Sequence, residues 1–177
     1  MRFLPTVALA LLSALTLQAA EVPRPAKPLT LKSMDGREIS VEQLRGKVVA
    51  VLFFSTDCPH CQQTTQVLNP IYAEWKARGL EILGLAVNDT AAGNLGQFKQ
   101  KFGAEFPLGL TTRSDWSRFG EFSVMHNPYV PYLIIVDRNG VIREEHPGQD
   151  RNFWMDQENN LRQSFDTLLK EHAKPSS

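Results

Sequence analysis

The chain has 177 residues, of which 42% are apolar, with 19 basic and 19 acidic side chains. This length suits one well-packed domain and is short for two. Because the charges balance, the composition gives no reason to expect nucleic acid or an anionic membrane surface as the partner.

Residues 1–20 have the order of a secretory signal peptide. A short, positively charged N-terminal region precedes an apolar run from Phe3 to Leu17, and small residues follow. The apolar run is shorter than a typical transmembrane helix. We expect cleavage after Ala20, although Gln18 is not the small residue usual before a cut, so an uncleaved membrane anchor stays open. The chain is predicted to be exported to the periplasm or another extracytoplasmic compartment, where disulfides form and persist.

Proline-rich residues 21–28 predict an extended leader between this signal and a single domain of residues 29–173. The domain opens with two short strand-like runs around Asp35-Gly36, which is a hairpin turn signal. The continuous apolar run from Val48 to Phe54 follows, and it is typical of a central strand covered on both faces.

Alternating helix and strand patterns follow this buried strand. In chain order they predict a helix ending at Gly79, a buried strand over Leu80 to Val87, a helix ending at Gly103, a short strand over Phe106 to Leu110, one or two helical turns over Ser114 to Gly120, a hairpin over Tyr132 to Ile142 and a last helix around Leu161 to Leu169. Alternation in the first half builds parallel strands, and the late hairpin adds antiparallel ones. The predicted fold is α/β, with a mixed central sheet and helices on both faces.

The only two cysteines, Cys58 and Cys61, form a CxxC pattern between the predicted strand and helix. Covalent haem attachment needs a histidine directly after the second cysteine, and Gln62 excludes it. A structural zinc site is disfavoured, because it usually needs four ligands and the chain has no second cysteine pair. A purely structural disulfide is also disfavoured, because a disulfide that closes so short a loop adds little stability. A Cu(I) site that includes His60 or His126 stays open.

A redox role for the pair has a positive mechanism. Cys58 falls near the N-terminus of the predicted helix, where unpaired backbone N–H groups and the helix dipole stabilise a thiolate and lower the thiol pKa. Pro59 fits the first helical turn, where its missing N–H is not needed. Cys61 lies one turn on, close enough to close a disulfide. The order strand, CxxC, helix in an exported chain therefore predicts a redox-active disulfide.

Three stretches resemble a known family: "LTLKSMDGREIS" (29–40), "LRGKVVAVLFFSTDCPHC" (44–61) and "VPYLIIVDRNGVI" (130–142). They look like exported thiol–disulfide oxidoreductases of the TlpA/ResA type, thioredoxin-fold proteins of the redoxin/AhpC-TSA group, and the resemblance covers residues 29–170. It implies a thioredoxin-like fold with an N-terminal β-hairpin extension and catalysis by Cys58 and Cys61. It also implies a cis peptide bond at Val130-Pro131, where the substrate backbone docks.

Several positions depart from this family pattern. Asp57 stands where relatives usually have Trp, and an exposed carboxylate there would raise the pKa of the Cys58 thiol. Leu52 replaces the buried acid of thioredoxins, and Thr64 replaces a Glu that TlpA-like reductases often carry. The usual proton acceptor for Cys61 is therefore missing.

The Pro59-His60 dipeptide matches the DsbA-type oxidases instead, in which a histidine at this place favours the thiolate. His60 is thus expected to tune the site or to be a solvated spacer, and the direction of electron flow is open, with a reductase preferred. His126 and Tyr129 either line the substrate groove or belong to a plain surface loop. Trp154 is expected to be a packing residue.

Three functions compete. In the first, an exported oxidoreductase without a cofactor forms a mixed disulfide between Cys58 and a client, and Cys61 resolves it. Its expected partners are client proteins with cysteines or disulfides and a membrane electron-transfer thiol protein, with no nucleic acid. The second is a peroxiredoxin-like peroxidase, for which Ser55 matches a hydroxyl position and Val51 stands where proline is expected. The third is a thioredoxin-like copper carrier, although such proteins space their cysteines by three residues.

Overall fold

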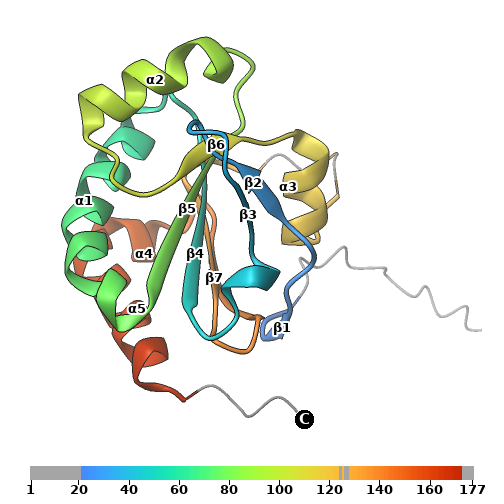
Figure 1. Cartoon of the computed structure of the whole chain (residues 1–177), viewed down its shortest axis with the longest axis vertical. Coiled ribbons are helices and arrows are strands. Elements are labelled where there is room, and N and C mark those ends of the chain that lie inside the picture. The colour runs from blue at the N-terminus through green and yellow to red at the C-terminus, as the bar shows by residue number, and fades with distance from the viewer. Residues whose placement is uncertain (1–20, 124, 126–127, 173–177) are drawn as a thin grey trace, which may run out of the picture.

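The structure is a computed structural model that describes residues 21–123, 125 and 128–172. A six-stranded sheet runs through it in the order β1-β8-β7-β4-β5-β6 (Figure 1). Its strands are β1 (Arg24–Pro25), β4 (Val48–Phe54), β5 (Leu80–Ala86), β6 (Leu108–Leu110), β7 (Tyr132–Val136) and β8 (Val141–His146). Strands β4, β5 and β6 are parallel, whereas β7, β8 and β1 pair antiparallel. The sheet is mixed, as predicted.

Strand β4 is central because every one of its side chains is buried. It pairs with β5 on one edge and β7 on the other, with Phe53 opposite both Leu85 and Tyr132. Its side chains alternate between two apolar clusters, so that Leu52 enters one and Phe53 the other. This two-sided burial explains the continuous apolar run in the sequence.

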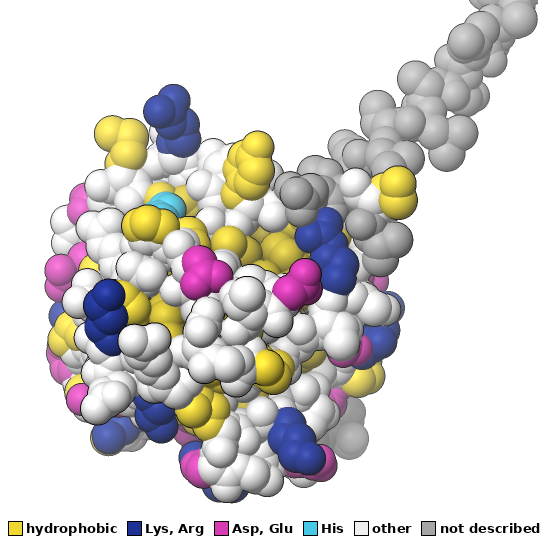
Figure 2. Space-filling view, turned by 90° about the horizontal axis from the view of Figure 1, so that it is seen from above, with side chains coloured by type: hydrophobic (Ala, Val, Ile, Leu, Met, Phe, Trp, Pro, Cys, Tyr) yellow, Lys and Arg dark blue, Asp and Glu magenta, His cyan; other side chains and the backbone are white. Residues whose placement is uncertain are grey.

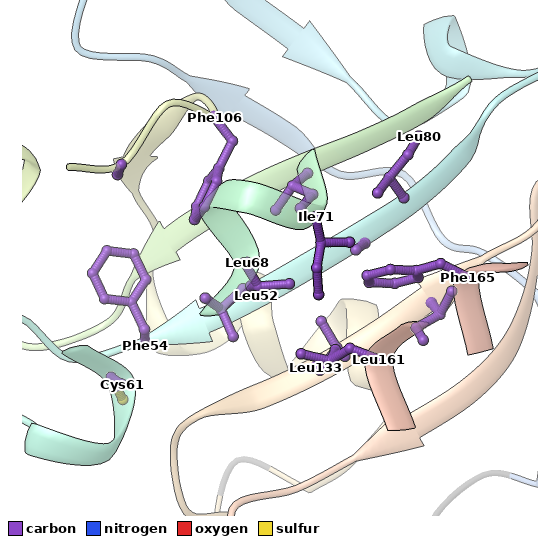
Figure 3. Close-up of a cluster of buried hydrophobic side chains, with 14 of the residues drawn as sticks. Leu52, Phe54, Cys61, Leu68, Ile71, Leu80, Phe106, Leu133, Leu161 and Phe165 are labelled. Carbon is purple, nitrogen blue, oxygen red and sulfur yellow. The ribbon is translucent and has the colours of Figure 1, made fainter. Parts of the chain in front are cut away.

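Helices cover both faces of the sheet (Figure 1). One face carries α1 (Pro59–Trp75), α2 (Ala91–Phe102), α4 (Arg151–Met155) and α5 (Gln157–Lys170), and the other carries α3 (Arg113–Gly120) and the hairpin of β2 (Thr30–Lys32) and β3 (Glu38–Ser40). Two 3-10 turns, η1 (Glu42–Leu44) and η2 (Lys76–Arg78), complete the elements. Figure 3 shows the apolar cluster that Leu52 enters, in which Leu68 and Ile71 of α1 approach Leu161 and Phe165 of α5.

The predicted elements are all present, and two further ones appear. Arg24 and Pro25, expected in an extended leader ahead of the domain, form an edge strand against β8. Arg24 is buried and pairs with Glu121 and Glu145, and Pro25 is tolerated because it lies on an edge. The short helix α4, capped by Asp150, is the second addition. Within the described part of the chain, no helix is long and apolar enough to cross a membrane.

Candidate active site

Cys58 and Cys61 lie at the carboxyl end of β4, where the chain turns into α1. Cys58 is the N-cap residue of α1 in an extended conformation, and Pro59 follows at the start of the helix, where its missing N–H is not needed. The Cys58 Sγ accepts a hydrogen bond from the backbone N–H of Cys61, with an N···S distance of 3.3 Å. Cys58 is half-buried and Cys61 is fully buried. Cys58 is therefore the thiol that another molecule can reach.

The two thiols differ strongly in acidity. The hydrogen bond from the Cys61 thiol, helped by the backbone N–H groups of Cys61 and His60 against the effect of burial, lowers the pKa of Cys58 to about 6. Burial raises the pKa of the Cys61 thiol far above its usual range, and the neighbouring Cys58 sulfur raises it further. At neutral pH the site thus holds a nucleophilic thiolate at Cys58 and a protonated thiol at Cys61.

The rate of Cys58 alkylation by iodoacetamide is expected to rise with pH through an inflection near 6, because the thiolate is the nucleophile. The folded thiol is more acidic than the unfolded one. The reduced protein therefore gains stability from about pH 6 up to about pH 9, and loses that gain as the pH falls through 6. Urea unfolding of the wild type and Cys58→Ser at several pH values checks the sign. An alkylation inflection above pH 8 would contradict this assignment.

The segment that precedes β7 faces Cys58. The Val130–Pro131 peptide bond is cis. When it is protonated, the Cys58 thiol donates to the carbonyl oxygen of Val130, with an S···O distance of 3.9 Å. Pro131 is buried, whereas the preceding Tyr129 is exposed over 66% of its surface. The structure thus brings the two cysteines and the Val130-Pro131 pair together, while His126 lies outside the described residues.

Asp57 is held by the loop after β5. Its carboxylate accepts hydrogen bonds from Asn88 Nδ2 at 3.1 Å and Thr90 Oγ1 at 2.9 Å, and Asn88 Oδ1 accepts the backbone N–H of Thr56 at 3.1 Å. Asp57 is not among the groups that set the pKa of Cys58. The expectation that this carboxylate raises the pKa of Cys58 therefore stays a prediction. The sequence does not mark Asn88 and Thr90, because they follow a different strand.

His60 packs against Trp154 of α4, with ring centroids 5.2 Å apart and ring planes nearly perpendicular at 83°. Burial lowers the pKa of His60, so its imidazole is neutral at neutral pH. His60 supports the Cys58 thiolate through its backbone N–H, and not through an imidazolium charge. Trp154 is 6% exposed, which fits the packing role expected for it.

Neutral side chains occupy the two positions at which the family pattern has an acid that could take the proton of Cys61. Thr64 is fully buried, and its hydroxyl donates to Oε1 of Gln157 at the start of α5, at 2.9 Å. Leu52 belongs to the apolar core. No carboxylate is among the described groups that set the pKa of Cys61. Gln157 was not marked by the sequence, since it lies almost a hundred positions from Thr64.

Apolar side chains gather on the end of the molecule at which α1 begins, around a histidine (Figure 2). Tyr129, next in the chain to Val130, is exposed, and Met155, next in the chain to Trp154, is 84% exposed. Apolar side chains are thus exposed next to the segments that contact Cys58 and His60. Among the residues that the structure describes, no group of three or more His, Cys, Asp and Glu side chains could hold a metal ion.

Comparison with known proteins adds three findings. The sequence profile of the AhpC/TSA family matches residues 22–145. A chloroplastic peroxiredoxin Q of Suaeda salsa is 30% identical over 119 residues, which are 64% of this chain and 54% of that protein. The thiol-disulfide oxidoreductase ResA of Geobacillus thermodenitrificans (strain NG80-2) is 26% identical over 130 residues, 71% of this chain and 69% of that protein. The match therefore spans about half the length of the peroxiredoxin.

The fold has solved counterparts. A thiol:disulfide interchange protein of the thioredoxin family from Chlorobium tepidum TLS superposes with a TM-score of 0.67 at 23% identity, covering 85% of this chain and 99% of that chain. At this identity the likeness concerns the fold alone. It confirms the predicted thioredoxin-like class.

Proposed function

The chain belongs to the AhpC/TSA family, and from that premise we propose that it is a thiol–disulfide oxidoreductase acting on cysteines of client proteins. One observation carries the proposal. A half-buried thiol whose pKa is lowered to about 6 caps α1, and a fully buried protonated thiol lies one turn on. This pairing separates an attacking sulfur from a resolving one.

In the reductive direction, the Cys58 thiolate attacks one sulfur of a client disulfide. That bond breaks, the other client sulfur leaves as a thiolate and takes a proton from water, and a mixed disulfide joins Cys58 to the client. Cys61 then gives up its proton and attacks Cys58 Sγ, which releases the second client thiolate and closes the Cys58–Cys61 disulfide. The client gains two electrons and the protein loses two. Because Thr64 and Gln157 are neutral, we propose that the Cys61 proton passes to the departing client thiolate.

The direction of electron flow follows from how strongly the thiolate is stabilised. A pKa of about 6 for Cys58 is closer to the value of about 7 in thioredoxin than to about 3.5 in DsbA. The neutral His60 ring adds no positive charge that would stabilise the reduced form further. We therefore propose a reductase, recharged by a membrane electron-transfer thiol protein.

Reduction of insulin disulfides with dithiothreitol as the electron donor tests this activity. The wild type is expected to accelerate insulin reduction, whereas Cys58→Ser should match the rate of dithiothreitol alone. Acceleration by Cys58→Ser equal to that of the wild type would refute the assignment of Cys58 as the attacking sulfur.

A second candidate is a thiol peroxidase, which the 30% identity to peroxiredoxin Q favours. Ser55 stands at the hydroxyl position of that family, but its Oγ accepts the backbone N–H of Asp57 at 3.3 Å. Hydrogen peroxide consumption with the same thiol donor separates the two candidates. Rapid peroxide consumption without insulin reduction would establish the peroxidase instead.

We also propose export, with residues 1–20 as the signal and residues 21–28 as a leader to the domain of residues 29–173. Residues 1–20 lie outside the described part of the chain, and Arg24–Pro25 of the leader is tied into the sheet. The mass of the mature protein recovered from an extracytoplasmic fraction tests this. A mass that includes residues 1–20 would point to an uncleaved anchor.

A further inference from the structure

The turn of residues 146–150, between β8 and α4, contacts one of the two segments that flank Cys58. The Gly148 N–H donates to the carbonyl oxygen of Tyr129 at 2.8 Å, and Gln149 Oε1 accepts the N–H of Tyr129 at 3.2 Å. A Cβ on Gly148 would lie 2.9 Å from the backbone of Tyr129 and Val130, so the turn and this segment are in direct contact. The turn therefore fixes the place of the Val130 carbonyl.

The same turn also holds the second flanking segment. The Pro147 carbonyl oxygen accepts the indole N–H of Trp154 at 2.8 Å. Trp154 in turn packs edge-on against His60, two residues from Cys58. One five-residue turn thus supports both sides of the candidate active site.

His146 closes this turn. Its Nδ1 lies 3.0 Å from Asp150 Oδ2, and its Nε2 lies 3.0 Å from Glu144 Oε2. The ring stacks on Phe153, with centroids 3.6 Å apart and planes at 10°, and the side chain is 16% exposed. Ser164 of α5 donates to the same Glu144 oxygen at 2.6 Å, while Asp150 Oδ1 caps α4 through the N–H of Phe153 at 3.3 Å.

The number of protons on the ring decides whether both contacts are favourable. A neutral imidazole has one N–H and can donate to only one carboxylate, whereas an imidazolium donates from both nitrogens. Although burial opposes it, hydrogen bonds from His146 and Ser164 hold the pKa of Glu144 below its usual range. In the described part of the chain, His146 is the one basic side chain that directly contacts the carboxylate of either Glu144 or Asp150.

We propose that His146 is a positioning residue for the redox site: by bridging Glu144 and Asp150 through its two ring nitrogens, it closes the turn that holds Val130 and Trp154 beside Cys58. Loss of either contact loosens both segments. This proposal depends on the proposed function in one respect, because the site that His146 positions is the Cys58–Cys61 redox pair. The groups that face His146 are Glu144 from β8, Asp150 from the turn, the Ser164 hydroxyl from α5 and the Phe153 ring from α4.

Two substitutions at His146 compare a charged side chain that can donate to both carboxylates with a neutral one. Arginine in His146→Arg is planar, permanently charged and able to donate to two carboxylates while stacking on Phe153. Glutamine in His146→Gln is neutral at every pH. His172→Gln is the matched control, because it removes an exposed histidine outside the turn. All variants are also made with Cys58→Ser, which removes the titration of the thiol.

The readouts are the Gly148 amide and Trp154 indole N–H resonances, compared among the variants at one pH. Both should keep the parent positions in His172→Gln and should move least in His146→Arg, whereas His146→Gln should move both together. Parent positions kept in His146→Gln would overturn the proposal. A change at His60 alone cannot imitate the joint movement, because His60 contacts only Trp154 of the two reporters.

Alkylation of Cys58 in the cysteine-containing proteins supplies the functional readout. We expect the rate of His146→Arg to stay close to the wild-type rate and the rate of His146→Gln to depart from it. The two variants should differ roughly three- to tenfold, as for the loss of one hydrogen bond. Equal rates in all proteins would refute a positioning role.

A third variant keeps the test valid if either His146 substitution fails to fold. Asp150→Asn retains an N-cap side chain for α4 but removes one of the two carboxylates that His146 contacts, so both reporter resonances should move as in His146→Gln. Unmoved resonances would overturn the proposal. These experiments follow conformation and alkylation and not client turnover, so their failure leaves the insulin assay as an independent test of the proposed function.

Discussion

Replacing Cys61 with alanine is expected to leave insulin covalently attached to Cys58 as a mixed disulfide. Cys61 is fully buried and one helical turn from Cys58, and it is the only other cysteine in the chain. Without it, nothing within the protein can release the client. The first step should survive but slow at pH 7, because the Cys61 thiol is the largest contributor to the lowered pKa of Cys58.

The adduct is measured by intact mass after mixing the reduced variant with insulin and blocking free thiols. Its mass should return to that of the free protein on addition of dithiothreitol. The double variant Cys58→Ser/Cys61→Ala is the control and should form no adduct. An adduct of equal yield on that control, or none on Cys61→Ala, would contradict the assigned roles of the two cysteines.

Phe165→Ala is expected to lower the free energy of unfolding by about 3–5 kcal/mol, the usual loss when a large aromatic side chain leaves a cavity in a core. Phe165 is fully buried on α5 and lies near Leu161 in the cluster that also holds Ile71 (Figure 3). For a chain of this size each kcal/mol lowers Tm by roughly 2–4 °C, so Tm should fall by on the order of 10 °C. Urea and thermal unfolding measure both quantities.

Gln163→Ala is the matched control, because Gln163 is exposed on the same helix and its loss should change stability by no more than about 0.5 kcal/mol. Phe165 lies at the opposite end of the cluster from Cys61 (Figure 3). The alkylation inflection of Cys58 should therefore stay near pH 6 in Phe165→Ala. A shifted inflection would contradict the claim that the site is independent of packing around Phe165. A decrease in the free energy of unfolding of less than about 1.5 kcal/mol would contradict the claim that Phe165 is a central core residue.

The strands and hairpins were predictable because their signals are local. Val48 to Phe54 is apolar throughout because β4 is buried on both faces, and Gly36 and Gly140 have positive φ at the turns that they mark. Strand β1 was not predictable as part of the sheet. The charge of Arg24 suggests exposure, and its burial is explained by partners about a hundred positions away, the carboxylates of Glu121 and Glu145 and the carbonyl oxygen of Gly120.

Helix α4 was missed for a different reason. It spans only Arg151–Met155, which is too short for an apolar repeat of 3.6 residues to show. Its cap and its contacts come from Asp150, Pro147 and His146.

At the site, the chemistry of the CxxC pair was predictable and its surroundings were not. The N-terminal position of Cys58 on α1 follows from the order strand, CxxC, helix. The hydrogen bonds that hold Asp57 were not predictable, because its partners Asn88 and Thr90 come from the loop after β5.

The reduction potential of the Cys58–Cys61 couple tests the central claim most directly. The protein is equilibrated in glutathione buffers of known potential, free thiols are alkylated, and the masses are measured. We predict that both thiols disappear together as one two-electron couple, with a midpoint nearer to about −270 mV, as in thioredoxin, than to about −120 mV, as in DsbA. Thiols that oxidise independently, or a midpoint near the DsbA value, would contradict the assignment of this protein as a thiol–disulfide reductase.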